Sequence, residues 1–185
     1  MAIKYHRIIL NGYSKDGLLY APSYCSPRFA VDGVQLPDMT DINFTLKDGY
    51  YADYMGADVT GRFVSERLKN LFQSYLKPFQ KIEFIPILVK SNKYDDRTYY
   101  LMHFNKVYDV IDKENSVYIA GTDSIIKPVL DYHKIKDLDI FNLDSFCTSL
   151  VVSETVGKEM KKKKDDRRDR IMSCLVFGQI INPKK

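Results

Sequence analysis

The sequence predicts an α+β fold in which a mainly antiparallel or mixed sheet carries two Ser-capped helices. Segments of strand-like composition outnumber those with helical periodicity, and the two kinds do not alternate regularly along the chain. An apolar pair followed by Ser and Glu occurs twice, at Ser65-Glu66 and at Ser153-Glu154, and this pattern is typical of a helix start. The 185 residues, of which 45% are hydrophobic, suffice for one core, so we expect a single domain over residues 1–185.

The N-terminal third of the chain predicts two strands, each followed by loops. Residues 5–10 form an apolar run that ends at an Asn-Gly turn signal, and this run predicts a strand. Residues 12–37 are rich in Gly, Pro, Ser and Tyr, so we expect loops with short extended pieces. Residues 42–46 alternate between apolar and polar, which predicts a half-buried strand. An Asp-Gly turn and the aromatic residues 50–54 then lead into a loop.

Residues 63–78 predict an amphipathic helix. The hydroxyl of Ser65 can accept a hydrogen bond from a first-turn N–H, and Glu66 lies at the positive end of the helix dipole. Pro78 cannot continue a helix, so it marks the end of the segment. The apolar residues of this segment fall on one helical face: Val64, Leu68, Leu71, Phe72, Tyr75 and Leu76.

The middle of the chain predicts several strands. Residues 82–89 form a strand candidate, and because Pro86 cannot donate a ladder hydrogen bond we place it at an edge or a bulge. Residues 125–132 are weakly patterned, and residues 135–141 fit either a strand or a short helical turn. The other strand candidates of this region are residues 98–104, 106–111 and 116–120.

The C-terminal part predicts a strand, a helix and a closing strand. Residues 150–152 form a short apolar strand that leads directly into the second helix. This helix begins at Ser153 and continues through a charged run. Residues 171–181 predict the closing strand, in which Gly178 is expected to form a bulge.

The charged run from Lys158 to Arg170 accounts for the net charge of the whole chain. It holds eight of the 28 basic residues and four of the 24 acidic ones, and the formal net charge of the chain is +4. Basic clusters bind phosphate through counterion release, but acids interrupt this run and no aromatic side chains for base stacking lie within it. We therefore interpret it as a solvated helix end crossed by salt bridges, which argues against nucleic acid as a partner.

No motif of this chain predicts a catalytic residue, a cofactor site or a metal site. The three histidines lack metal-ligand spacing, and His103 lies inside a strand-like run, where we expect a packed side chain. The cysteines Cys25, Cys147 and Cys174 are widely spaced, which fits a reducing cytoplasm. The sequence shows neither a signal peptide nor an apolar run long enough to cross a membrane.

Two groups of residues are candidates for binding a partner protein. Tyrosine and arginine are enriched at the energetic centres of protein interfaces, and several tyrosines lie in or beside predicted loops. The lysine-led run offers a second contact region, which could steer an acidic partner. The candidate residues are Tyr50, Tyr51, Tyr54, Tyr94, Arg97, Lys161, Lys162, Lys163, Lys164 and Arg167.

Six short, mostly apolar motifs follow one another in a recognisable order: FVSERLK at 63–69, EFIPI at 83–87, YYLMHFNKV at 99–107, DVID at 109–112, IF at 140–141 and LVVSE at 150–154. Their order resembles that of the imm-eleven family of bacterial immunity proteins, which are found beside polymorphic toxins. The resemblance covers roughly residues 41–181 and leaves the first 40 residues less constrained.

This resemblance implies a non-enzymatic role. A member of such a family binds a cognate toxin, often one delivered by contact-dependent secretion, and protects the producing cell and its kin. The toxin is then expected to be encoded by an adjacent gene. The residues themselves leave two alternatives open: a nucleic-acid-binding module that uses the run from Lys158 to Arg170, and an enzyme whose cleft gathers His103 with acids.

Overall fold

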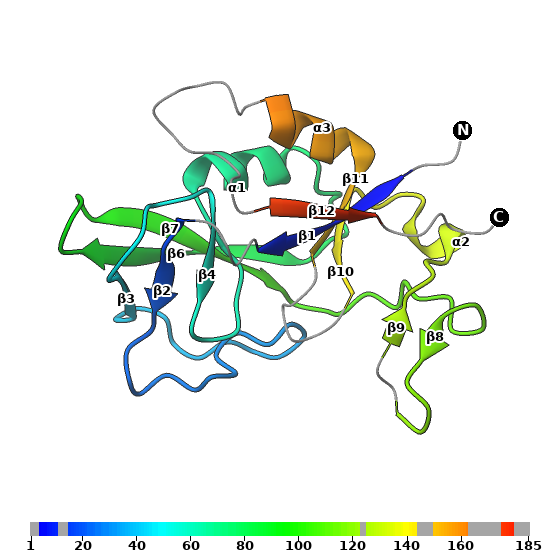
Figure 1. Ribbon diagram of the computed structural model, residues 1–185, viewed down its shortest axis with the longest axis horizontal. Coiled ribbons are helices and arrows are strands. Elements are labelled where there is room, and N and C mark those ends of the chain that lie inside the picture. Colours follow the sequence, from blue (N-terminus) through cyan, green and yellow to red (C-terminus); the bar gives the residue numbers. More distant parts are fainter. Residues whose placement is uncertain (1–3, 11–14, 123–124, 144–149, 163–174, 180–185) are drawn as a thin grey trace.

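The computed structural model of this chain describes residues 4–10, 15–122, 125–143, 150–162 and 175–179. A closed barrel and an open sheet lie beside each other, and helices pack against both (Figure 1). The fold is therefore α+β and mostly sheet, as the sequence predicts.

Six strands close into the barrel, in the order β2-β3-β6-β7-β5-β4. Two of its pairs, β2 with β4 and β3 with β6, are parallel, and the other pairs are antiparallel. The barrel is thus a mixed sheet. Its strands are β2 (Leu18–Tyr20), β3 (Asn43–Leu46), β4 (Tyr54–Ala57), β5 (Phe63–Val64), β6 (Ile82–Ser91) and β7 (Arg97–Phe104).

The second sheet has four antiparallel strands in the order β10-β11-β1-β12. These strands are β1 (Tyr5–Leu10), β10 (Ile140–Asn142), β11 (Leu150–Ser153) and β12 (Leu175–Gln179). A separate hairpin, formed by β8 (Val117–Tyr118) and β9 (Ile125–Lys127), projects at the lower right of Figure 1.

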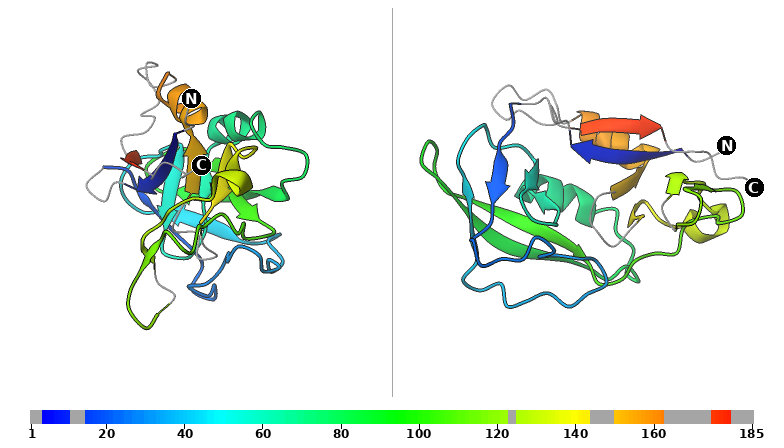
Figure 2. Two further views of the ribbon diagram at one scale, coloured as in Figure 1. Left: turned by 90° about the vertical axis from the view of Figure 1, so that its right-hand side faces the viewer. Right: turned by 60° about the horizontal axis from the view of Figure 1, so that its bottom comes forward.

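Three helices occur in the described residues: α1 (Glu66–Gln73), α2 (Tyr132–Ile135) and α3 (Glu154–Lys162). Helix α1 packs on β5 and β7 of the barrel, α3 packs on β1 and β11 of the sheet, and the two helices contact each other. Figure 2 shows α1 between the long strands β6 and β7 and the second sheet. The two helices therefore join the barrel to the sheet.

Apolar side chains fill the barrel. Strand β6 shows the expected period of two, because Ile87 and Val89 are buried whereas Leu88 and Lys90 are exposed. The rings of Phe44 and Phe63 meet inside, with their centroids 4.7 Å apart. Other fully buried barrel residues are Leu19, Leu46, Met55 and Leu101.

A second cluster is shared by the barrel, the open sheet and both longer helices. Its buried members come from β1, β10 and β11 of the sheet, from β4, β5 and β7 of the barrel, and from the inner faces of α1 and α3. Burial of one apolar surface against several elements makes their formation interdependent. The principal members are Ile8, Tyr54, Val64, Leu68, Phe72, Met102, Phe104, Val152, Val156 and Met160.

A buried polar network lies beside this shared cluster. Asp32, in the long loop after β2, pairs with Arg62 at 2.7 Å and accepts hydrogen bonds from the backbone N–H of Phe104 (3.1 Å) and the side-chain amide of Asn142 (3.0 Å). The Nδ1 atom of His103 lies 3.8 Å from the same carboxylate. Since Asn142 belongs to β10 and Phe104 to β7, Asp32 connects the loop to both sheets.

The structure confirms the strands predicted at 5–10, 42–46, 82–89 and 98–104, with boundaries shifted by a few residues. Pro86 lies where β6 has a neighbour on one side only, because β3 pairs with β6 from Leu88 onward. The prediction of an edge position is therefore confirmed locally. The strand predicted at 116–120 shortens to β8, and the open assignment at 135–141 resolves into the end of α2 and then β10.

Only one of the two predicted Ser caps is confirmed. The Ser65 hydroxyl accepts a hydrogen bond from the N–H of Leu68 and caps α1. Ser153 ends β11 and donates to the Asp139 carboxylate at 2.7 Å, and its hydroxyl accepts only a long hydrogen bond of 3.4 Å from the N–H of Val156. The predicted continuation of this helix beyond Lys162 lies outside the described residues.

Four further points differ from the expectations. Residues 106–111 do not form a strand: this segment meets residues 129–131 through an isolated bridge between Ile111 and Leu130 and a hydrogen bond from the Asp131 N–H to the Val110 carbonyl. Strand β4 was not predicted, since its pairing with β2 and β5 depends on closure of the barrel. Helix α1 ends at Gln73, and Val64 belongs to β5, where it pairs with Tyr54 and Tyr100. Gly178 pairs with Arg7 in regular register, without the expected bulge.

Candidate partner-binding surface

Four of the predicted partner-binding residues lie together at one end of the barrel. The ring centroids of Tyr50 and Tyr94 are 6.0 Å apart, and those of Tyr51 and Tyr94 are 5.9 Å apart. The guanidinium of Arg97 lies over the Tyr51 ring, 4.7 Å from its centroid. These residues come from the β3–β4 connection and the β6–β7 hairpin, and we call them, together with Tyr99, the tyrosine cluster.

Tyr99 anchors this cluster in the barrel core. Its ring stacks on that of Tyr51, with a centroid distance of 5.8 Å and an interplanar angle of 21°. The Tyr99 hydroxyl donates to the carbonyl of Ala52 at 2.6 Å, and the Tyr51 hydroxyl donates to the carbonyl of Val89 at 3.2 Å. Burial raises the pKa of Tyr51, although Arg97 acts in the opposite direction. The inner rings are therefore fixed, and they support the outer ones.

The outer rings of the cluster reach solvent. Tyr50 is 42% exposed and Tyr94 is 38% exposed, whereas Tyr99 is only 2% exposed. Lys93 donates to the Asp48 carboxylate at 2.8 Å, which ties the β6–β7 hairpin to the β3–β4 connection and lowers the pKa of Asp48. Exposed tyrosine rings beside an arginine are residue types enriched at the energetic centres of protein interfaces, so this surface is a candidate binding site.

Two glycines bring the backbone of Tyr50 into place. The Tyr50 carbonyl accepts from the N–H of Gly17 at 2.9 Å, and its N–H donates to the carbonyl of Lys15 at 3.2 Å. Gly49 has a φ of 79°, and a Cβ atom there would lie 2.5 Å from the Cα of Gly17. Because no side chain fits between these backbones, glycine is required at both positions.

A polar pocket of about 330 Å³ opens beside the tyrosine cluster. The Asp53 carboxylate accepts hydrogen bonds there from the Ser65 hydroxyl (2.5 Å) and from Arg67. The Ser65 side chain also caps α1, and Arg67 belongs to the first turn of this helix, so both contacts with Asp53 hold the start of the helix in place. The pocket is lined by Tyr51, Ala52, Asp53, Ser65, Glu66, Arg67, Arg97 and Tyr99.

Sequence reasoning missed Tyr99, Asp53 and Arg67. Tyr99 lies in a regular strand, and nothing in its alternation distinguishes a ring that supports a surface from one that fills a core. Asp53 and Arg67 are separated by β4 and β5, so their ion pair becomes visible only when these two strands pair. Among the residues that line this pocket, Ser65 is the one that the sequence marked, through its helix-capping pattern.

Tyr54 does not belong to this surface. It was expected beside a loop, but it begins β4, is 7% exposed and packs in the cluster shared by the barrel and the open sheet. Tyr54 is therefore a core residue of this structure and is not part of the exposed tyrosine cluster.

The predicted lysines lie on a different element. Lys161 and Lys162 are exposed at the end of α3, and Lys162 pairs with Glu159 at 2.7 Å. Lys158 pairs with Glu154 at 3.0 Å on the same helix. These pairs agree with a solvated helix crossed by salt bridges. Lys163, Lys164 and Arg167 lie outside the described residues.

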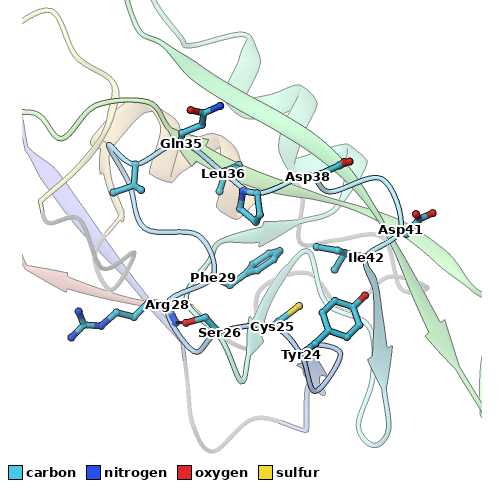
Figure 3. Close-up of a pocket in the computed structure, with 12 residues that line it drawn as sticks. Tyr24, Cys25, Ser26, Arg28, Phe29, Gln35, Leu36, Asp38, Asp41 and Ile42 are labelled. Carbon is cyan, nitrogen blue, oxygen red and sulfur yellow. Dashed lines mark hydrogen bonds between the residues drawn. The ribbon is translucent and has the colours of Figure 1, made fainter.

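A larger depression of about 690 Å³ opens in the loop between β2 and β3. Figure 3 shows Phe29 and Ile42 between Leu36 on one side and Tyr24 on the other, with Arg28 pointing away from them. Tyr24 is 72% exposed, and the rim carries Asp38 and Asp41. The half-buried Cys25 also lines this depression, and burial raises the pKa of its thiol. Cys147 and Cys174 lie outside the described residues.

The geometry does not gather His103 with acids in a cleft. His103 is 2% exposed inside the buried network, and it lines neither of the two depressions described above. Burial lowers its pKa, and the neighbouring Asp32 opposes that effect only in part. The expectation of a packed histidine is confirmed. No group of three metal-ligating side chains occurs within the described ranges. No helix in that same part of the chain is long and apolar enough to span a membrane.

Comparison with characterised proteins found no match to this chain. Comparison with protein families found one, the immunity protein family Imm11, whose model matches residues 13–175. The match includes the loop between β2 and β3, so it begins earlier than the resemblance in the sequence indicated. Such a match supports an immunity function, which implies a toxin as partner. The chain belongs to the immunity protein family Imm11.

Proposed function

We propose that this protein neutralises a cognate bacterial toxin by direct protein–protein binding and so protects the producing cell and its kin. Its family membership supports an immunity function. The mode of action is supported by the tyrosine cluster, in which exposed rings and an arginine stand on a buried, hydrogen-bonded support. In this proposal the protein is cytoplasmic and non-catalytic, and the toxin is encoded by an adjacent gene and delivered by a secretion system.

The tyrosine cluster is the main structural support for this proposal, because its side chains lose little conformational freedom when a partner binds. A tyrosine presents a large contact area with only two side-chain torsions, and here the stack of Tyr51 on Tyr99 already restricts one ring. Ordering flexible side chains costs about 0.5–1.5 kcal/mol each on association. A surface whose rings are already held by neighbours avoids part of that cost, and this favours tight binding.

The lysine-led run is a second candidate contact region. In the described residues its first lysines are paired with acids on α3, which favours a solvated helix over a nucleic-acid site. A role in steering the toxin is compatible with this pairing, because exposed ion pairs exchange readily with solvent. We therefore keep Lys161 and Lys162, with Lys163, Lys164 and Arg167, as proposed secondary contacts.

The first test is co-expression with the protein encoded next to this gene. Growth rescue together with co-purification is the expected result. Loss of rescue and of co-purification in Tyr94→Ala would assign binding to the tyrosine cluster. Tyr24→Ala is the matched control, because Tyr24 is also exposed but lies in a different loop. Rescue without a stable complex would contradict inhibition by binding. If only Tyr24→Ala lost rescue and co-purification, the binding face would be assigned instead to the depression in the loop between β2 and β3.

A further inference from the structure

The cations at the tyrosine cluster differ in whether they have an acidic partner. Lys93 is paired with Asp48 at 2.8 Å, and Arg67 is paired with Asp53. The contact found for the Arg97 guanidinium is the ring of Tyr51, and no carboxylate of the described residues forms an ion pair with it. A guanidinium has five N–H donors, so the exposed Arg97 presents hydrogen-bond donors at the surface.

The backbone of Arg97 is placed by strand pairing, and its guanidinium contacts an aromatic ring. Arg97 begins β7, where it pairs with Val89 of β6, and its guanidinium stands over a ring that is itself stacked on the buried Tyr99. A cation over an aromatic face gains about 0.5–1 kcal/mol at exposed sites. This contact favours one placement of the guanidinium before any partner binds.

The surrounding charges select the kind of anion that can approach. Exposed carboxylates at Glu66, Asp95 and Asp96 lie in the same pocket or the same hairpin, and Asp96 already accepts from the backbone N–H of Ser91 at 3.2 Å. These acids repel a polyanion such as nucleic acid. A single carboxylate carries one negative charge, so these acids repel it less than they repel a polyanion.

We propose that Arg97 binds an Asp or Glu side chain of the toxin, and that the rings of Tyr50, Tyr51 and Tyr94 enclose this ion pair. Arginine pairs with a carboxylate through two parallel N–H···O bonds, which gives both energy and orientation. Exclusion of water by the rings around the pair strengthens it. The inference rests on the proposed function, since the carboxylate belongs to the toxin.

The test uses three substitutions at one position and the purified protein encoded by the adjacent gene as the binding probe. Arg97→Ala removes the guanidinium, Arg97→Lys keeps the charge without the planar donor set, and Arg97→Glu reverses the charge. Lys136→Ala is the matched control, because it removes one exposed positive charge from the end of α2, away from the tyrosine cluster. Dissociation constants are measured by titration calorimetry at low and high salt.

The expected ranking is wild type, Arg97→Lys, Arg97→Ala and then Arg97→Glu, from tightest to weakest. We expect Arg97→Ala to raise the dissociation constant at least about tenfold, and Arg97→Glu to raise it further because two carboxylates then face each other. High salt should narrow the difference between the Ala and Glu variants. Lys136→Ala should bind as the wild type does.

Two results would overturn this inference while leaving the proposed function intact. The first is a wild-type complex whose affinity Arg97→Ala does not change. The second is an Arg97→Glu variant that binds no more weakly than Arg97→Ala, since the group facing Arg97 would then not be acidic. Failure of the wild-type protein to bind at all would instead contradict the proposed function, and with it the assignment of a toxin carboxylate.

Discussion

The guanidinium of Arg62 and the carboxylate of Asp32 form an ion pair of 2.7 Å in which both side chains are fully buried. Arg62 precedes β5, and Asp32 lies in the loop after β2, so the pair fastens that loop to the barrel. The Asp32 carboxylate also accepts from Phe104 and Asn142, and this joins the barrel to the open sheet. Asp32 is thus a central connection of the fold.

Asp32→Asn should destabilise the protein strongly. The substitution keeps the shape of the side chain but leaves the Arg62 charge buried without a counter-charge, which costs about 3–5 kcal/mol. Urea unfolding followed by circular dichroism measures the change. Asp38→Asn is the matched control, because Asp38 is exposed in the same loop and bonds only to Thr40 among its described contacts. If both substitutions lowered the free energy of unfolding equally, the buried ion pair would contribute no more to stability than an exposed carboxylate does.

The stability of the protein should fall as the pH drops below about 6.5, the ordinary pKa of histidine. Burial lowers the pKa of His103 in the folded state, so the unfolded chain binds the proton more readily, and acid favours unfolding. His103 therefore contributes full stability above its unfolded pKa and loses it as the pH falls toward its folded one. His103→Gln should flatten this dependence in unfolding experiments at a series of pH values.

His6 provides the comparison for this prediction. Its pKa is also lowered, first by burial and then by Lys161, so His6→Gln should remove a separate part of the same pH dependence. If His103→Gln leaves the pH dependence unchanged and His6→Gln removes it, the acid sensitivity belongs to His6 on β1 rather than to the buried network.

Gly49→Ala should both destabilise the protein and displace Tyr50. The φ of 79° disfavours a side chain, and the new Cβ would lie 2.5 Å from the Cα of Gly17. Strain of this kind costs about 1–3 kcal/mol. Gly121→Ala separates the two causes, because Gly121 has a φ of 75° but a Cβ atom there would meet no other atom within 4 Å. The prediction fails if both variants unfold at the same urea concentration.

The barrel and the open sheet should unfold together. Their shared cluster contains residues of both sheets and of α1 and α3, so loss of one sheet exposes apolar surface of the other. We propose that residues 1–185 form a single domain, and we expect one transition in which circular dichroism and tyrosine fluorescence coincide. Leu68→Ala and Val152→Ala should shift that transition without dividing it. Two separate transitions would disprove the single domain.

Local chemistry explains which predictions from the sequence were confirmed. The Ser65 cap, the alternation of β6 and the Asn-Gly turn signal after β1 each depend on a few neighbouring residues, so the local sequence is enough to predict them. Residues 106–111 show the limit of such signals. Their apolar composition matches a strand, but the buried Val110 and Ile111 pack in an irregular segment against Leu130.

The sequence by itself determined the α+β class, the start of α1, most of the long strands, the order of motifs that marks the family, and the tyrosines and arginine from which the candidate surface is built. The tertiary structure decided which of these residues meet. Closure of the barrel brings Tyr50 and Tyr51 to Tyr94, Arg97 and Tyr99, and it turns Tyr54 into the core. These contacts join residues distant along the chain, and their energies depend on strand pairing and burial, which short-range propensity does not encode.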